Sequence, residues 1–394
     1  MTTDRTETAA PLLIRDADVY APEPLGRRDV FCAGGAVVAL EPELTLPASL
    51  GVRVVEAGGR TLVPGLIDGH VHIAGAGGEG GPATRTPEVP LSRLVEGGIT
   101  TVVGLLGADG ATRTVESVLM KARALRAEGL STWIWTGAYP IPTPTLTGDV
   151  TRDLVLFEEV IGAGEIAISD HRSSSPSVQE LVQLAKAVRL GGLLGRKSGL
   201  VHLHLGDAED PYRPIRDAVA TSELTFRQFH PTHANRSRAV FEEAKRYARQ
   251  ATVDITTAAW AAFPDEEVKP ARALRELLDA GVPLEHVTFT SDAGGSLPQF
   301  DTDGRLIALT TGRPDSLWRE ARDAVREEGF PLEEALLPVT ATPARLLHLP
   351  GKGRIGAGAD TDLRLLDDLE PSWVVARGRP LMEEGVLIAR GTFE

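Results

Sequence analysis

The feature that most constrains the fold is the alternation of strand-length apolar runs with helix-like stretches through the middle of the chain. The apolar runs lie at residues 62–73, 100–107, 132–139, 166–169, 200–207, 226–235, 253–258 and 287–295. Helix-like stretches such as 115–130, 177–192 and 238–251 lie between them. Eight strands alternating with helices over roughly 280 residues predict an α/β fold, a (β/α)8 TIM-like barrel. A doubly wound open sheet is the alternative. Polar residues that gather at the carboxyl ends of the strands favour the barrel.

Both ends of the chain differ from the middle. Short apolar runs bounded by Gly and Asp recur in residues 11–63, as in "LLIRDADVY", "AVVAL" and "VRVVEAGG", and after residue 350, as in "TDLRLLDD", "SWVVARG" and "GVLIARGTF". Such alternation between turn residues is typical of strands. We therefore expect a small β-sandwich domain built from both termini, residues 1–63 and 346–394, beside a barrel domain of residues 64–345.

The charge and composition of the chain limit the kinds of binding partner and metal site that it can have. The formal net charge of −14 disfavours nucleic acid or an anionic membrane surface as the main partner. The single cysteine, Cys32, excludes an intramolecular disulfide and a cysteine-rich metal site. The segment "MTTDRTETAAPLLIRD" lacks the apolar core of a signal peptide, and no run of about 18 apolar residues occurs. We expect a cytoplasmic protein without a membrane span.

Histidines at the predicted strand ends suggest a metal site. His70 and His72 in "GLIDGHVHI" are two residues apart on a strand, so both side chains point to one face, which in a barrel is the interior. Two adjacent imidazoles make half a metal site, whereas the alternative is a pair of hydrogen-bonded core histidines.

Two more histidines lie near the ends of later strands. They are His204 in "LVHLHLGD" and His233 in "HPTHAN", with His202 and His230 as their respective rivals. The sequence favours the histidine nearer the carboxyl end in each case. Any one of them alone could be a core histidine, but their shared position at strand ends indicates a common site.

Asp292 in "TFTSDAGG" lies at the end of the eighth predicted strand. A carboxylate there can bind one metal ion and accept a proton from water that the metal acidifies. The alternative is that Asp292 caps the following turn, which "SDAGG" would also suit.

The motifs together resemble those of a known family. "PGLIDGHVHI" beside a β-rich domain is similar to the amidohydrolase superfamily of metal-dependent hydrolases. The sequence most resembles the isoaspartyl dipeptidases, which cleave β-aspartyl peptide bonds, through "GGEGGPATRTPEV", "TGAYP", "AISDHRS", "THANR", "SDAGGS" and "RGTFE". The HxH pair is common to the superfamily, whereas the Gly-rich loop at 74–89, "SDHR" and "THxNR" are more specific.

The resemblance implies a site for two zinc ions. His70, His72 and Asp292 would hold one ion, and His204 and His233 the other. The anion between the ions is a carboxylated lysine in the family, and the matching position here is Glu165.

The glutamate keeps the charge of −1 but has a shorter reach than the carbamate. A Glu-bridged metal pair is the main expectation, and a single ion or an empty site are the alternatives. An engineered or inactivating substitution would look the same in the sequence. The ligand types also leave manganese, cobalt and iron open.

The resemblance also assigns substrate contacts. Glu79 would pair with the α-ammonium, and Arg172 and Arg236 would hold carboxylates through their guanidinium forks. Tyr139 would hydrogen-bond the oxyanion. The remaining contacts come from Gly77 and Ser296. Where the family has a substrate-contacting threonine, this chain has Ala108.

The expected activity is hydrolysis of β-aspartyl dipeptides by metal-activated hydroxide, with Asp292 moving the proton to the leaving amine. One alternative is an amidohydrolase acting on an N-acyl amino acid or a cyclic amide. Another is a catalytically silent binding protein that has lost the paired metals. A homo-oligomer is expected from the resemblance alone.

Overall fold

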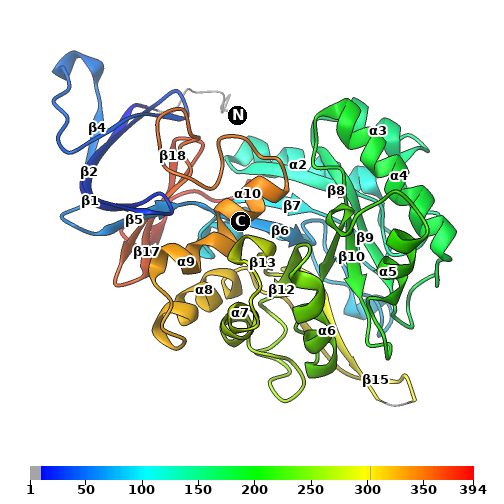
Figure 1. Cartoon of the computed structure of the whole chain (residues 1–394). Coiled ribbons are helices and arrows are strands. Elements are labelled where there is room, and N and C mark those ends of the chain that lie inside the picture. Colours follow the sequence, from blue (N-terminus) through cyan, green and yellow to red (C-terminus); the bar gives the residue numbers. More distant parts are fainter. Residues whose placement is uncertain (1–9, 302) are drawn as a thin grey trace.

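The computed structural model describes residues 10–301 and 303–394 (Figure 1). Parallel strands in its middle part are β6 (Leu66–Val71), β7 (Ile99–Gly104), β8 (Ser131–Thr136), β9 (Val160–Ile168), β10 (Leu200–Leu205), β11 (Phe229–Thr232), β12 (Val253–Thr256) and β13 (Val287–Thr290). Hydrogen-bonded ladders join β6 through β11 in sequence order, and a separate ladder joins β12 to β13. Each of the eight predicted apolar runs overlaps one of these strands, although β9 begins six residues before the run at 166–169.

Contacts at the two remaining borders close the strands into a ring. Between β11 and β12, the Ala234 amide donates to the Asp254 carbonyl at 3.1 Å, and the Thr232 hydroxyl donates to the Asp254 carboxylate at 2.7 Å. Past the ends of β6 and β13, the His72 amide donates to the Ala293 carbonyl at 2.8 Å. The predicted TIM-like barrel is therefore confirmed.

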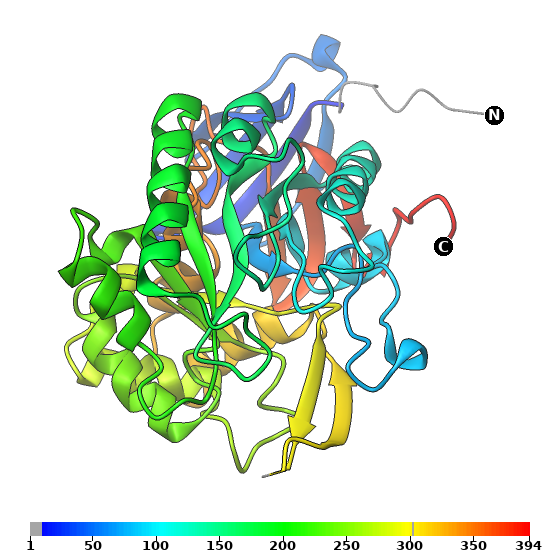
Figure 2. The ribbon, with the colours of Figure 1, turned by 90° about the vertical axis from the view of Figure 1, so that its right-hand side faces the viewer.

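Helices follow most of the barrel strands and cover the outside of the ring (Figure 2). They are α1 (Leu91–Glu96), α2 (Val115–Glu128), α3 (Val150–Leu156), α4 (Val178–Gly195), α5 (Arg213–Ala220), α6 (Arg238–Ala248), α7 (Pro270–Asp279), α8 (Ser316–Arg326), α9 (Leu332–Leu336) and α10 (Ala341–Leu346). The three helix-like stretches of the sequence correspond to α2, α4 and α6. The start of α4 is fixed by a capping box, in which Ser177 and Glu180 bond each other's backbone amides. No helix in residues 10–301 and 303–394 is long and apolar enough to cross a membrane.

Strands from both ends of the chain form one further sheet. They are β1 (Leu12–Tyr20), β2 (Pro24–Ala33), β3 (Ala36–Glu41), β4 (Arg53–Glu56), β5 (Thr61–Pro64), β16 (Leu363–Asp367), β17 (Glu370–Ala376), β18 (Arg379–Glu383) and β19 (Val386–Leu387). The antiparallel pairing of β5 with β16 joins the two ends. The expected β domain is confirmed, although hydrogen bonds link its strands into one continuous sheet. Its limits at 63/64 and 345/346 stay a prediction.

Some elements differ from the sequence prediction. In the tail predicted as a strand at 385–393, only Val386–Leu387 is a strand. The next two amides, of Ile388 and Ala389, both donate to the Leu381 carbonyl, so the regular ladder ends there. β2 and β18, which carry charged and proline residues, were not predicted. Beyond β13 a hairpin forms from β14 (Ser296–Phe300) and β15 (Leu306–Thr311), and it projects from the barrel in Figure 2.

The two ends of the barrel have different roles. Near the strand starts, Ile67, Ile161 and Leu200 pack with Leu347 in one apolar cluster that closes this end. Polar side chains line the opposite end, at the carboxyl ends of the strands, as in other barrels of this class.

Candidate metal and substrate site

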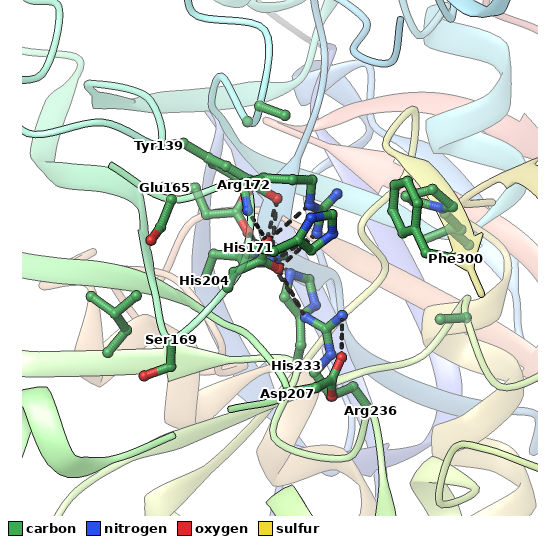
Figure 3. A pocket seen from close by; sticks show the side chains of 18 of the residues that line it. Tyr139, Glu165, Ser169, His171, Arg172, His204, Asp207, His233, Arg236 and Phe300 are labelled. Carbon is green, nitrogen blue, oxygen red and sulfur yellow. Dashed lines mark hydrogen bonds and ion pairs between the residues drawn. The ribbon is translucent and has the colours of Figure 1, made fainter. Parts of the chain in front are cut away.

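A cavity of about 1030 Å³ opens at the carboxyl ends of the barrel strands (Figure 3). Most of the site residues expected from the sequence line it: His72, Gly77, Glu79, Tyr139, Glu165, Arg172, His204, His233, Arg236, Asp292 and Ser296. Ala108, the departure from the family pattern, also lines it. His70 lies against the buried carboxylates of this set rather than on the cavity wall.

Glu165 lies at the centre of the cluster and is only 1% exposed. Its Oε1 is 2.7 Å from Nδ1 of His204 and 3.0 Å from Nε2 of His233. Its Oε2 faces the other way, 3.7 Å from Nε2 of His70 and 4.0 Å from Nε2 of His72. The two oxygens of one carboxylate thus address two separate histidine pairs.

Asp292 completes the second half of the cluster. Its Oδ1 is 3.1 Å from Nε2 of His72 and 3.5 Å from Nε2 of His70. Three overlapping groups of ligand atoms, each within 4.8 Å of one another, result: His70–His72–Glu165, His70–His233–Asp292 and Glu165–His204–His233. Among the described residues, His70 Nε2 and Asp292 Oδ1 are buried without a hydrogen-bond partner. Unsatisfied ligand atoms that converge in this way fit metal ions.

The outward-facing nitrogens of two histidines have partners that orient the rings. His233 Nδ1 is 2.7 Å from the Thr256 hydroxyl, and His204 Nε2 is 2.9 Å from Oδ2 of Asp170. Such outer partners fix the tautomer of a metal-binding histidine and leave the inner nitrogen free to coordinate.

His202 gives His70 the same support. The Nδ1 of His202 lies 3.1 Å from the His230 carbonyl, which can only accept, so this nitrogen carries the proton. Burial lowers the pKa of His202 well below its usual value and keeps the ring neutral. Its Nε2 is then the acceptor for His70 Nδ1–H at 2.9 Å. The proton on Nδ1 leaves Nε2 of a neutral His70 as a free lone pair.

The two rivals noted in the sequence therefore lie outside the ligand groups. His202 contacts a ligand from behind, and the ring of His230 lies 3.1 Å from the Thr252 hydroxyl. The geometry favours His204 and His233 as ligands.

The electrostatics of the cluster favour positive charge. Burial alone would raise the pKa of the Glu165 carboxyl, but the charges of His70 and His204 hold it well below its usual range. Burial would also raise the pKa of Asp292, but the nearby His70 and His72 rings lower it below its usual value. Burial also opposes a charge on His70, yet the Glu165 and Asp292 carboxylates raise its pKa to about 9. Two buried, ionised carboxylates call for the cations that metal ions supply.

The expected substrate contacts lie beside the ligands (Figure 3). Arg172 makes a two-pronged ion pair with Asp170 at 3.0 and 2.9 Å. Its Nη1 is also 3.6 Å from Glu79, whose carboxylate accepts from the Ser296 hydroxyl at 2.8 Å. Arg236 pairs with Asp207 at 3.0 Å. The structure thus brings the predicted anion and both predicted cations to one wall of the cavity.

Asp170 was not predicted from the sequence. Its carboxylate is 3% exposed and links the ligand His204 to Arg172, and Arg236 Nη1 lies 3.8 Å from it. Burial would raise its pKa, but the hydrogen bonds from His204 and Arg172 hold it far below its usual range. Its position in "SDHR", directly after β9, could have identified it as a site residue from the sequence.

Tyr139 stands over the half of the cluster that contains His204. Its hydroxyl is 2.9 Å from Nδ1 of His204, and the Arg172 guanidinium lies 5.6 Å from the ring centre. Burial, and next the Glu165 charge, raise the pKa of the phenol well above its usual value. The hydroxyl therefore keeps its proton and can donate.

Two of the expected ligands have unusual backbone conformations. His233 and Asp292 have φ of 60° and 51°, a region that costs side-chain-bearing residues about 1 kcal/mol. Turn hydrogen bonds hold both: the Arg236 amide donates to the His233 carbonyl, and the Gly295 amide to the Asp292 carbonyl, each at 3.1 Å. Strain of this kind is common where a side chain must be aimed into a site.

Comparisons with known proteins agree with this geometry. Residues 215–385 match the sequence model of the amidohydrolase family. An allantoinase of Deinococcus radiodurans is 24% identical, covering 90% of this chain and 86% of its own. A dihydroorotase of Syntrophobacter fumaroxidans is 26% identical, covering 85% and 81%.

Solved structures give a nearer match. A β-aspartyl dipeptidase of Fervidobacterium islandicum in complex with β-Asp-Leu is 39% identical, with a TM-score of 0.89 over 96% of this chain and 98% of that one. A D-hydantoinase at 18% identity, with a TM-score of 0.69 over 97% of each chain, shares the fold.

Proposed function

Because this chain belongs to the β-aspartyl dipeptidase family of the amidohydrolases, we propose that it hydrolyses β-aspartyl dipeptides at a metal site centred on Glu165. The observation that carries the proposal is the position of Glu79, Arg172 and Arg236 in one cavity with the ligand cluster. A β-aspartyl dipeptide has one ammonium and two carboxylates. These three side chains supply the complementary charges.

We propose a pair of zinc ions as the metal. One would be held by His70, His72 and Asp292, and the other by His204 and His233, with the Glu165 carboxylate shared between them. The opposite directions of the two Glu165 oxygens support sharing over a single ion. Divalent ions in such a site acidify water and polarise the scissile carbonyl.

Side chains of the protein would transfer the proton, stabilise the oxyanion and position the other groups. Asp292 would accept a proton at Oδ1, which is buried and without a hydrogen-bond partner in the described chain, and would return it to the leaving amine. Tyr139 would donate its hydroxyl to the oxyanion that develops on the scissile carbonyl. Asp170 would keep Arg172 and His204 in place.

Substrate binding would use the charges of the same wall. The α-ammonium would pair with Glu79, which Ser296 already holds by two hydrogen bonds. Gly77 would contribute a backbone contact: a Cβ there would lie 2.6 Å from the Thr84 carbonyl, so only glycine fits. Binding would exchange ion pairs within the protein for ion pairs with the dipeptide, which reduces the desolvation cost.

A location in the cytoplasm and a homo-oligomeric state complete the proposal; the homo-oligomeric state rests on the resemblance alone. The 39% identity to a β-aspartyl dipeptidase outweighs the matches to cyclic-amide hydrolases at 24–26%.

A substrate panel tests the proposed function. Purified protein loaded with zinc should hydrolyse β-Asp-Leu, but not N-acetyl-leucine, allantoin or dihydroorotate, because none of these has an ammonium group and none has two carboxylates. Hydrolysis of a cyclic amide in preference to β-Asp-Leu would contradict the proposal. A Glu79→Gln variant should raise KM for β-Asp-Leu.

A further inference from the structure

Glu267 is an acidic side chain of the cavity wall that has no role in the proposed chemistry. It lies in the segment after β12, at the end of the barrel where the site is built, and it lines the cavity. Its Oε2 is buried and lacks a hydrogen-bond partner. Within residues 10–301 and 303–394, no hydrogen bond or ion pair to its carboxylate is found.

Hydrogen bonds of the next residue, Val268, fix the position of Glu267. The Val268 amide donates to the Asn235 carbonyl at 2.9 Å, and the Asn235 side-chain amide donates to the Val268 carbonyl at 3.0 Å. Asn235 is fully buried and directly precedes Arg236. These bonds hold Glu267 beside the arginine side of the cavity.

Several other carboxylates of the same cavity have partners. Glu165 and Asp170 contact histidines, Asp207 pairs with Arg236, and Glu79 accepts from Ser296. Nearer to Glu267, Glu266 accepts from the Gln299 side chain. A carboxyl group without a partner in a half-buried wall is costly to ionise. Its partner would therefore be a group of a ligand bound in the cavity.

The charges of a β-aspartyl dipeptide identify that group. Its only fixed cation, the α-ammonium, is assigned to Glu79, and its two carboxylates to the arginines. What remains is the side chain of the second residue, the one part of the substrate that varies. Burial raises the pKa of Glu267 to about 8, with Arg236 lowering it and Asp292 raising it, so the carboxylate lies within the electrostatic reach of both. Asp292 would protonate the leaving amine, which belongs to this second residue.

We infer that Glu267 selects β-aspartyl dipeptides whose second residue has a cationic side chain, such as lysine or arginine. The inference rests on the proposed function, and it specifies the substrate class of that site. A substrate ammonium would give the Glu267 carboxylate its missing partner, and a hydrogen bond between charged groups is worth about 1.5–3 kcal/mol, or about 10- to 100-fold in affinity.

The experiment compares β-Asp-Lys with β-Asp-norleucine, which has a side chain of nearly the same length without the charge. The measured quantity is the ratio of their kcat/KM values with the zinc-loaded protein. We expect a ratio of at least about 10 in favour of lysine for the natural chain, falling close to 1 in Glu267→Gln. The matched control is Asp265→Asn, which makes the same charge change at an exposed position of the same segment and should keep the ratio.

Two results would overturn the inference. One is a ratio near 1 in the natural chain, and the other is a ratio that Glu267→Gln leaves unchanged in protein shown to be folded by its thermal unfolding. Either leaves the proposed function standing, because β-Asp-norleucine is still cleaved. Hydrolysis of neither dipeptide would instead refute the proposed function, and the inference with it.

Discussion

Replacing His202 should weaken metal binding although the residue touches no metal. The bond from His70 Nδ1–H to His202 Nε2 is 2.9 Å long, and both side chains are fully buried. In His202→Leu the acceptor is lost. In the metal-free protein, His70 can respond by releasing its Nδ1 proton and keeping a proton on Nε2, which faces the Asp292 carboxylate at 3.5 Å. The metal-bound protein cannot, because the ion needs that nitrogen.

The cost therefore falls on the metal-bound state. An unpartnered buried N–H costs about 1–3 kcal/mol, and loss of an outer partner of a metal-binding histidine typically weakens metal affinity about 10- to 100-fold. We expect His202→Leu to raise the zinc dissociation constant by about this factor. His202→Gln should lose less, because its amide oxygen can accept from His70 Nδ1–H.

Competition with a chromophoric chelator measures the affinity without any use of activity. His230→Leu is the control, since the ring of His230 bonds Thr252 and not a ligand, and its backbone carbonyl remains. Thermal unfolding of each variant checks that the fold is kept. Unchanged zinc affinity in a folded His202→Leu protein would refute the tautomer argument.

Three further predictions concern single residues. Asp292→Asn should lower kcat for β-Asp-Leu by about 10²- to 10⁴-fold, since the proton carrier is lost. Metal analysis should find a zinc content close to that of the natural chain. Unchanged turnover would exclude Asp292 as the proton carrier. Glu165→Gln removes the negative charge between the two histidine pairs, so metal analysis should find fewer than two zinc ions per chain, and two ions retained would contradict the shared carboxylate. Burial raises the pKa of Cys32 to about 11, so at pH 8 only about one thousandth of the thiol is ionised. A thiol reagent should therefore find no reactive cysteine in native protein and one in denaturant, and rapid labelling of native protein would show that the β-domain core is open.

The barrel was predictable because its strands are buried on both faces. Such strands are largely apolar, as in 102–106, and most of the candidate site residues lie near the strand ends. The β domain was harder. β2 and β18 include charged residues and prolines that interrupt the alternating apolar pattern, although each pairs with the strands next to it in the sequence.

The candidate ligands could be predicted for a related reason. His70 and His72 follow the two-residue period of a strand, and the family resemblance supplied the rest. The sequence did not show that His202 lies behind His70, since that contact joins β6 to β10 across 132 residues. The position nearer the strand end favoured His204 but did not exclude His202 from the metal site.

Glu165 and Glu267 show the two limits of sequence reasoning. A glutamate inside an apolar strand was a visible anomaly, and its burial at 1% exposure follows from the histidines around it. Glu267 lies in "PDEEVKP", which reads as an exposed acidic turn. Only the bonds between Val268 and Asn235 turn it toward the cavity, and these are tertiary contacts.

The most direct test of the account is the rate of β-Asp-Leu hydrolysis as zinc is added stepwise to metal-free protein. The account predicts that kcat rises until two zinc ions are bound per chain. A plateau at one ion would contradict the shared Glu165 carboxylate. No turnover at any zinc level, in folded protein, would contradict the function itself.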